Sequence, residues 1–418
     1  RLYTDPFSFE LRNTESQLIL RTLDEELIAG YGPPSASATE PSLTADEFPG
    51  WLPPQNSELD WIVFDQTINA EMTVNGAKIT LAASSAENET LTIEVSATGN
   101  RMDVSYSLNE AATDRFSRLG QSFYINENEQ FFGLGERLSS VNHLGQSYYC
   151  WNEEMGLPLP EEHPLSPENP PPNGPSMTGF PVPFLLSTSG YGLWLNTHHW
   201  SAFHLGSDDP SLWRMEAYDT EFNFTVVVNQ QPSNTLYDFT QDNGRLETPP
   251  IWTFGVRHTL AQETEVMGME EWRLIREMDL PVTLIEDGLQ YLPEGVDISL
   301  ESSLLERNTA LHDWGFRVLS HVSPHISSVN EAISDHYTWT EEQGYLLQGE
   351  TGMTGLISLE PDEAAIYATL DITNPSAIGW FQGILRSTLD LGYDGWRVNH
   401  GALFNGDSIF SDGRSGIE

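Results

Sequence analysis

The spacing of apolar residues changes near Pro249, and this change constrains the fold more than any other feature of the chain. Before Pro249, apolar and polar residues alternate, as in residues 91–95 and 102–106, which a Gly-Asn pair separates. Alternation with period two is typical of strands that bury one face, and Gly-Asn favours a turn between them. The first part of the chain, residues 1–248, is therefore predicted to form an antiparallel β-sandwich. Further segments with this spacing are residues 72–74, 79–81, 184–186, 192–195 and 222–228.

After Pro249, short apolar segments alternate with longer segments that have helical spacing. Strands are predicted at residues 251–257, 281–285, 316–322 and 396–398, and helices at residues 266–278, 300–314 and 376–391. Strands that alternate with helices form parallel βα units, and the natural candidate is a TIM, or (β/α)8, barrel. Residues 249–418 supply only the first half of such a barrel. Because half a barrel would leave two open edges, we expect a fragment of a longer protein, or a chain completed by another polypeptide.

The chain is strongly acidic, since 62 Asp and Glu residues against 18 Lys and Arg residues give a formal net charge of -44. The absence of a basic footprint argues against nucleic acid and against an anionic membrane surface as partners. A net charge of this size destabilises a fold by self-repulsion, which salt screens within about 10 Å at ~0.1 M. A halophilic protein from a salt-rich habitat is the preferred explanation, and an ordinary acidic extracellular protein is the alternative. The chain contains no run of about 20 apolar residues, so no membrane-spanning helix is predicted.

The chain has a single cysteine, Cys150, so it cannot form an intramolecular disulfide, and its cysteine content does not indicate a compartment. The neighbours of Cys150 are two tyrosines and a tryptophan, which predicts a thiol buried in a strand rather than a nucleophile. His198 and His199 are adjacent and would point apart in a strand, so no metal site is predicted. No glycine loop for nucleotide binding is visible, and no cofactor is expected.

Residues 394–402, with the sequence DGWRVNHGA, follow the last predicted helix. They resemble the strand end on which retaining α-glycosidases of glycoside hydrolase family 31 carry their nucleophilic aspartate. Four further segments are similar to other blocks of that family and stand in the family order. These are residues 131–137 (FFGLGER), residues 181–187 (PVPFLLS) with GYG at 190–192, residues 244–255 (GR followed by PPIWTFG) and residues 371–375 (DITNP). The resemblance therefore covers most of the chain.

This resemblance implies both a fold and an activity. Family 31 proteins of the α-glucosidase and α-xylosidase type have a galactose mutarotase-like β-sandwich before a (β/α)8 catalytic barrel. Retaining members hydrolyse terminal α-glycosidic bonds, so an α-linked carbohydrate is the expected substrate or ligand. The family also includes α-galactosidases and sulfoquinovosidases, and the resemblance does not identify the sugar.

The position of the family nucleophile is occupied here by Asn399. A retaining glycosidase uses two carboxyl groups about 5–5.5 Å apart, one as nucleophile and one as acid/base. An amide is a much poorer nucleophile, and the family's acid/base aspartate lies well downstream, which would place it beyond Glu418. His400 and Ala402 also differ from the family pattern, which favours natural divergence over a single engineered change. Asp394 is no replacement, because an offset of five residues places the two side chains on opposite faces of a strand.

Three residues are expected to bind the substrate at the ends of barrel strands, where active-site loops gather. Glu286 and Asp287 follow the second predicted strand. Asp287 is similar to the family's acidic residue that holds sugar hydroxyls. The alternative is that the two residues form a solvated acidic turn. His325 follows the third predicted strand and either donates to sugar or caps its own loop. Arg397 lies two residues before the nucleophile position, on the same face of its strand, and is expected to pair with an acidic residue. Asp371 is expected to orient loop backbone.

Three hypotheses remain for the function. In the first, the protein hydrolyses terminal α-glycosidic bonds through an unusual nucleophile, direct attack by water or a different reaction. In the second, it is a catalytically inactive relative that binds carbohydrate or has a regulatory role. In the third, the substrate has changed and another residue supplies the carboxylate. Completing the reading frame beyond Glu418, and looking for an aspartate that faces Asn399, would distinguish among them.

Overall fold

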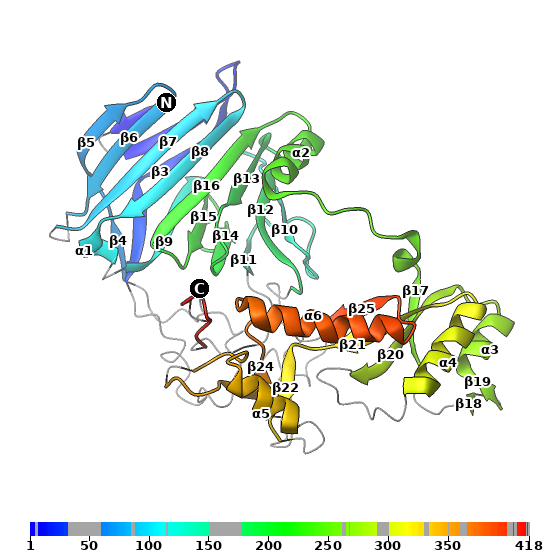
Figure 1. Cartoon of the computed structure of the whole chain (residues 1–418). Helices are drawn as coiled ribbons and strands as arrows, with labels where there is room; N and C mark the ends of the chain where they lie inside the picture. The colour runs from blue at the N-terminus through cyan, green and yellow to red at the C-terminus, as the bar shows by residue number, and fades with distance from the viewer. Residues whose placement is uncertain are drawn as a thin grey trace. The chain divides into compact units, whose positions relative to one another are not determined.

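Two units make up the computed structural model of the chain, and they meet in the sequence between Arg245 and Leu246 (Figure 1). The structure describes residues 1–4, 7–31, 60–84, 88–113, 116–150, 178–260, 265–266, 268–290, 301–329, 334–349, 351–358, 366–398, 404, 408–414 and 416. Among these residues, no helix has both the length and the apolar character that crossing a membrane requires.

The first unit contains two antiparallel sheets of eight strands each. One sheet has the order β1-β2-β3-β9-β15-β14-β11, with β4 paired to β3, and the other has the order β10-β12-β13-β16-β8-β7-β6-β5. The strands of the former are β1 (Leu2–Thr4), β2 (Phe7–Arg12), β3 (Leu18–Tyr31), β4 (Asp60–Val63), β9 (Phe116–Tyr124), β11 (Gln146–Cys150), β14 (Ser201–Leu205) and β15 (Leu212–Ala217). Those of the latter are β5 (Gln66–Met72), β6 (Gly76–Ala82), β7 (Thr90–Thr98), β8 (Arg101–Leu108), β10 (Phe131–Gly135), β12 (Pro181–Ser187), β13 (Tyr191–Leu195) and β16 (Glu221–Val228).

A single core lies between these two sheets. Phe123 of β9 stacks on Trp213 of β15 with ring centroids 4.3 Å apart, and meets Phe224 of β16 in the other sheet edge-on at 6.2 Å. Alternate residues of β7 and β8 are buried, so the period-two pattern of the sequence builds this core. The predicted antiparallel arrangement is confirmed. Cys150 is also buried, as predicted, and burial raises the pKa of its thiol to about 11.

Turns and helices of the first unit follow local signals in the sequence. The predicted turn between β7 and β8 is present at Gly99, whose φ of 63° suits glycine. Helix α1 (Glu110–Thr113) is a single turn, whereas α2 (Pro232–Asn243) starts with proline at a position where no backbone donor is lost. Phe239 of α2 lies 4.4 Å from Phe184 and 5.5 Å from Trp194, ring centroid to ring centroid, and so covers part of one sheet.

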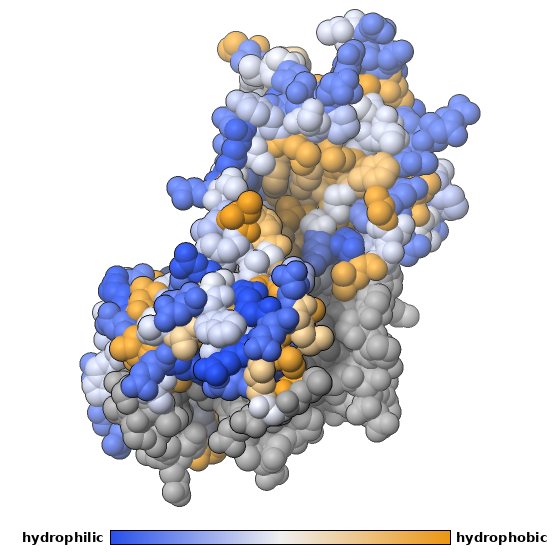
Figure 2. Space-filling model, turned by 90° about the vertical axis from the view of Figure 1, so that its right-hand side faces the viewer, coloured by the Kyte–Doolittle hydropathy of each residue, from blue (hydrophilic) through white to orange (hydrophobic). Residues whose placement is uncertain are grey.

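The second unit is built on a parallel sheet with the strand order β17-β20-β21-β25. Its strands are β17 (Val256–Leu260), β20 (Val282–Gln290), β21 (Arg317–Val322) and β25 (Gly395–Val398). Helices α3 (Glu271–Glu277) and α4 (Glu301–Asp313) cover one face, where Trp272 and Leu311 form a buried cluster with Ile285 and Val318. Figure 2 shows the side of this unit that carries α3 and α4, with many hydrophilic residues and scattered hydrophobic ones. Strand and helix alternate in a parallel sheet, as predicted.

Helix α6 (Pro375–Asp390) leads the chain into β25. Its start is explained by Asn374, whose side-chain oxygen accepts a hydrogen bond from Ser376 N at 3.0 Å, and by proline at the first helical position. Trp396 Nε1 of β25 donates to Thr388 Oγ1 of α6 at 2.7 Å, which fixes the helix against the strand.

The strand predicted at residues 251–257 starts only at Val256. The preceding residues form a 3-10 turn, η1 (Ile251–Phe254), in which Thr253 donates to Pro250 O from its backbone nitrogen at 3.0 Å and from Oγ1 at 2.7 Å. This local hydrogen bonding competes with sheet pairing, and the prediction was wrong for these residues.

The helix predicted at residues 266–278 starts only at Glu271. Before it, β18 (Glu265–Val266) and β19 (Met269–Glu270) form a short antiparallel pair. Gly268 lies between them with a φ of 76°, a left-handed conformation that interrupts a helix. The first part of this prediction was therefore wrong.

A small antiparallel sheet between β21 and α6 was not predicted from the sequence. It has the order β22-β24-β23, with β22 (His325–Ser327), β24 (Ile366–Thr369) and β23 (Leu356–Ser358). Helix α5 (Ser334–Glu342) lies between β22 and β23 in the chain. Strands of three or four residues contain too few alternations to be distinguished from loops by their spacing.

Candidate substrate-binding site on the parallel sheet

Glu286 is a fully buried carboxylate in the middle of β20. Arg257 of β17 pairs with Leu284, which lies two positions before Glu286 on β20. Glu286 itself pairs with Leu319 of β21, which lies two positions before His321. His321 in turn pairs with Arg397 of β25. Residues that are paired across strands, or two apart within one strand, point to the same face of a sheet. These four residues therefore share one face, opposite the face that α3 and α4 cover.

The side chains of Arg257, His321 and Arg397 converge on Glu286, and these four residues are called the Glu286 cluster below. Arg397 Nη1 donates to Glu286 Oε1 at 2.7 Å, and His321 Nε2 hydrogen-bonds to the same oxygen. Arg257 Nε lies 2.9 Å from Glu286 Oε2 and forms an ion pair with it. Four strands that are distant in the sequence are thus connected through one carboxylate.

The cluster holds Glu286 in its charged form. Burial alone would raise the pKa of this carboxyl group, but the hydrogen bonds from Arg397 and His321 and the charges of the two arginines outweigh burial, so its pKa is lowered. Glu286 is consequently unsuited to act as a general acid near neutral pH. Its chemical role is to orient Arg397 and Arg257, whose side chains are 40% and 50% exposed.

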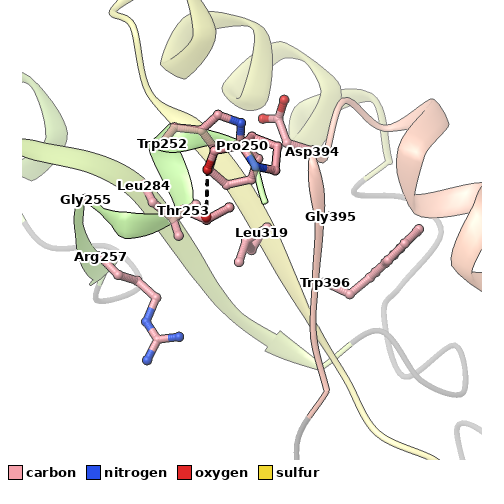
Figure 3. Close-up of a pocket in the computed structure, with 10 residues that line it drawn as sticks. All are labelled: Pro250, Trp252, Thr253, Gly255, Arg257, Leu284, Leu319, Asp394, Gly395 and Trp396. Atoms are coloured by element: carbon pink, nitrogen blue, oxygen red, sulfur yellow. Dashed lines mark hydrogen bonds between the residues drawn. The ribbon is translucent and has the colours of Figure 1, made fainter. Parts of the chain in front are cut away.

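A pocket of about 660 Å³ lies at the amino-terminal ends of the same strands (Figure 3). Its lining includes Trp252 before β17 and Trp396 at the start of β25. In Figure 3 the guanidinium group of Arg257 points away from Trp252 and Asp394, in keeping with its ion pair to Glu286. The charged groups of the Glu286 cluster therefore lie further along the strands than this pocket.

Asp394 is occupied by structural contacts at the start of β25. Its carboxylate accepts hydrogen bonds from Arg317 Nη1 at 2.6 Å, from Val318 N at 2.9 Å and from His312 Nε2 at 2.8 Å. Burial would raise the pKa of Asp394, but the hydrogen bonds from Val318, His312 and Arg317 lower it overall. Asp394 thereby joins β25 to β21 and α4.

The expected pairing of Arg397 with an acidic residue is confirmed, and its partner is Glu286. The placement of Glu286 after its strand was wrong, because β20 extends to Gln290 and encloses it. The central position of Glu286 was missed for this reason. A usable signal is present, since Glu286 continues the every-second-residue spacing of Val282 and Leu284, and an acidic residue in that register needs a buried cation.

The remaining predicted site residues lie elsewhere or outside the described part. Asp287 belongs to β20, but its side chain is outside the described residues, and so is Asn399. His325 is buried at the start of β22, and its Nδ1 lies 2.9 Å from Thr369 Oγ1 of β24. The structure therefore does not bring His325 into the Glu286 cluster.

Asp371 orients loop backbone, as predicted. Its Oδ1 accepts hydrogen bonds from Thr373 N at 2.8 Å and Thr373 Oγ1 at 2.6 Å, and its Oδ2 accepts from Ser411 N at 2.8 Å. Asp371 is buried, so these contacts fix the loop before α6 against the segment that follows β25.

Comparison with known proteins adds to this geometry. Residues 2–204 match the family described as Glycosyl hydrolase 31 N-terminal galactose mutarotase-like domain. The chain is similar to the α-xylosidase XylQ of Lactiplantibacillus pentosus, with 24% identity over 306 residues that cover 68% of this chain and 36% of that protein. It is also similar to an α-xylosidase of Emericella nidulans, with 22% identity over 65% of this chain and 33% of that protein. The chain thus spans about a third of the length of these relatives.

Solved structures show a related fold. A family 31 sulfoquinovosidase from E. rectale, bound to an aza-sugar inhibitor, superposes with a TM-score of 0.72 at 17% identity, covering 100% of this chain and 61% of that one. A family 31 dextranase of Flavobacterium johnsoniae, bound to glucose, has a TM-score of 0.60 at 17% identity, covering 82% of this chain and 42% of that one.

Proposed function

Because this chain is a relative of glycoside hydrolase family 31, we propose that the whole protein binds α-linked glycosides and hydrolyses their terminal bond with retention. The observation that carries the proposal is the contact between Arg397 and Glu286, which fixes the end of β25 two residues before Asn399. Residues two apart on a strand share a face, so position 399 would present its side chain on the side of the Glu286 cluster. The family nucleophile belongs at that position.

The proposed architecture around this site is a (β/α)8 barrel, of which the parallel sheet is the first half. The strand order follows the order in the sequence, and α3 and α4 cover only the face opposite the Glu286 cluster. In such a barrel, the uncovered face would line the interior, and substrate would bind at the carboxyl ends of the strands. The domain division that we propose is a β-sandwich over residues 1–248 and barrel strands over residues 249–418.

The proposed roles of the site residues follow from where their strands end. Asp287, next to Glu286 in the second half of β20, would accept hydrogen bonds from sugar hydroxyls, and Arg397 would donate to the sugar. For His325, the contact with Thr369 supports the role of fixing its own loop. Retaining hydrolysis needs two carboxyl groups, and the side chain of Asn399 is an amide. If the protein turns over substrate, another residue must therefore supply the carboxylate.

A second function is favoured by Asn399 itself. A relative without a nucleophile can keep the sugar-binding pocket and bind α-glycosides without cleaving them. Both functions share the fold, and fold alone does not separate them.

The test is a direct assay of the whole protein with nitrophenyl α-xyloside and nitrophenyl α-glucoside, in dilute buffer and in molar salt. Release of nitrophenol above the uncatalysed rate, with a product of retained anomeric configuration in NMR spectra, supports hydrolysis. Binding of the methyl glycosides in calorimetry without any release supports the binding function. The absence of both nitrophenol release and glycoside binding, in dilute buffer and in molar salt, would contradict both functions.

A further inference from the structure

A row of polar side chains crosses the outer face of one sheet of the first unit. Lys78 on β6 pairs with Glu94 on β7, Glu94 pairs with Ser105 on β8, and Ser105 pairs with Asn223 on β16. Asn196, directly after β13, continues the row, because its backbone nitrogen donates to Asn223 O at 2.8 Å. Residues paired across strands point to the same face, and the alternate residues of β7 and β8 are buried in the core. These five outward residues are called the polar row below.

The polar row lines a pocket of about 330 Å³. Figure 1 shows the strands β6, β7, β8 and β16 side by side, with α2 near β13. Helix α2 covers the sheet at Trp194, whose ring lies 5.5 Å from that of Phe239. At another part of the pocket wall, Asp103 is paired with Arg101 at 2.7 Å. The row itself stays accessible from the outer side of the sheet, since each of its residues is exposed or half-buried.

The middle of the polar row has hydrogen-bonding groups that the fold does not use. Within the described residues, the side chains of Ser105 and Asn223 have no hydrogen-bond partner, although both line the pocket. Asn196 donates from Nδ2 to Thr225 Oγ1 at 3.2 Å, which leaves its side-chain oxygen available. A serine hydroxyl both donates and accepts, and an asparagine amide offers two donors and one acceptor. These groups match a ligand whose own groups also donate and accept.

The charges of the polar row cancel. Lys78, the only lysine of the chain, donates from Nζ to Glu94 Oε1 at 2.7 Å, and the other three residues are uncharged. The row is therefore locally neutral in a chain with a formal net charge of -44. A cationic ligand would need an unpaired carboxylate and an anionic ligand an unpaired cation, and the row offers neither. The matching ligand is uncharged and rich in hydroxyl groups, which is the chemistry of a neutral carbohydrate.

The dimensions of the polar row suit a chain of sugars rather than a single one. Neighbouring strands lie about 4.8 Å apart, so a row from β6 to the end of β13 is about 19 Å long. Neighbouring strands are also rotated by about 20–25° relative to each other, so the row coils along its length. A ligand that follows the row must coil with it. α-1,4-linked glucose chains coil, whereas β-1,4-linked glucose chains are extended and flat.

We propose that the polar row binds a short α-linked oligosaccharide, which lies across the strands with Ser105 and Asn223 near its centre. The row belongs to the first unit and the Glu286 cluster to the second, so this binding goes beyond the proposed function. It requires neither an active nucleophile nor the residues of the parallel sheet.

The first experiment is calorimetry of the whole protein with maltotetraose and cellotetraose, which contain the same four sugars in different linkage. Methyl α-D-glucoside is present at high concentration, so that a site for single glycosides is already filled. We expect maltotetraose to bind about tenfold more tightly than cellotetraose, because the extended chain would lose one or two hydrogen bonds of the row. No binding of maltotetraose, or equal affinities of the two tetrasaccharides, would overturn the proposal.

The second experiment tests the residues. Asn223→Leu removes the amide at similar size and should weaken maltotetraose binding about tenfold, and Ser105→Ala should weaken it about threefold. Ser107→Ala is the matched control, because Ser107 lies on the same face of β8 but outside the pocket, and it should leave the affinity unchanged. The urea midpoint shows that each variant is folded, and Ser105→Ala decides the question if Asn223→Leu is not. Wild-type affinity in the folded variants would contradict the proposal.

Hydrolysis of nitrophenyl α-glucoside separates this inference from the proposed function. The row variants should leave its rate unchanged. Maltotetraose binding that depends on Asn223, in a protein that neither hydrolyses nitrophenyl glycosides nor binds methyl glycosides, would keep this inference and reject the proposed function. Hydrolysis by a protein whose maltotetraose affinity is unaffected by Asn223→Leu and Ser105→Ala would do the reverse.

Discussion

Arg397 on β25 reaches past β21 to Glu286 on β20, where its Nη1 lies 2.7 Å from Oε1 across a sequence separation of 111 residues. This contact joins two strands that are not neighbours in the sheet. It gives a buried carboxylate a charged hydrogen-bond partner and holds the strand end that precedes Asn399. The cluster is therefore both a stabilising element and the charged part of the candidate site.

The coupling between Glu286 and Arg397 should be measurable in a double-mutant cycle. Glu286→Gln and Arg397→Gln are each expected to lower the free energy of unfolding by about 1–3 kcal/mol, since each removes a hydrogen bond to a charged group. The coupling free energy measured by urea unfolding should be about 0.5–3 kcal/mol. The control is the exposed pair Arg273–Glu270, for which we expect less than about 1 kcal/mol. A coupling no larger than the control would show that the cluster does not stabilise the fold.

Stability should depend on pH through Glu286. Its pKa is lower in the folded state than the ordinary value of 4.5, so its ionised form stabilises the fold. This contribution is fully present above about pH 4.5, and it is lost as the pH falls through the folded pKa. Relief of acidic self-repulsion acts in the opposite direction, so the quantity to measure is the difference in unfolding free energy between wild type and Glu286→Gln. This difference should shrink between pH 6 and pH 3, and a constant difference would contradict the assignment.

Salt should stabilise this protein by screening its net charge of -44. The urea midpoint is expected to rise between 0.1 M and 2 M potassium chloride. Sucrose at matched water activity is the control for effects that do not depend on charge. Equal stability in dilute buffer and in molar salt would argue against a halophilic protein and for an ordinary acidic one.

Sequence spacing predicted those parts of the fold in which burial repeats regularly. β7 and β8 were predicted because their apolar residues alternate, and α6 because residues 376–391 have helical spacing. η1 was missed because Thr253 forms local hydrogen bonds that no apolar pattern indicates. Glu286 was misplaced for a different reason, since its burial is compensated by arginines on two other strands. The register of Glu286 with Val282 and Leu284 signals its burial, but which arginines compensate it is a property of the tertiary fold and leaves no periodic signal.

Trp213 is expected to be among the residues on which the β-sandwich depends. It is fully buried and stacks on Phe123 with centroids 4.3 Å apart. Trp213→Ala would leave a large cavity and should cost about 3–5 kcal/mol of unfolding free energy. Val74→Ala is the control, because Val74 is fully exposed in the β5–β6 turn and should change stability by less than about 0.5 kcal/mol. Similar effects of the two substitutions would contradict the packing of this core.

Asn399→Asp tests whether the site is otherwise competent for hydrolysis. A carboxylate at position 399 could attack the anomeric carbon, whereas the amide cannot form the glycosyl ester of a retaining reaction. If the rest of the machinery is present in the whole protein, the rate with nitrophenyl α-glycosides should rise on the order of 10²-fold or more, because a nucleophile is among the costliest groups to remove. Asn399→Ala is the control and should remain at or below the wild-type rate. An active wild type whose rate is unchanged by both substitutions would instead show that another residue supplies the carboxylate. A wild type and Asn399→Asp that both bind glycoside without turnover would show that more than the nucleophile has been lost, and would favour the binding function.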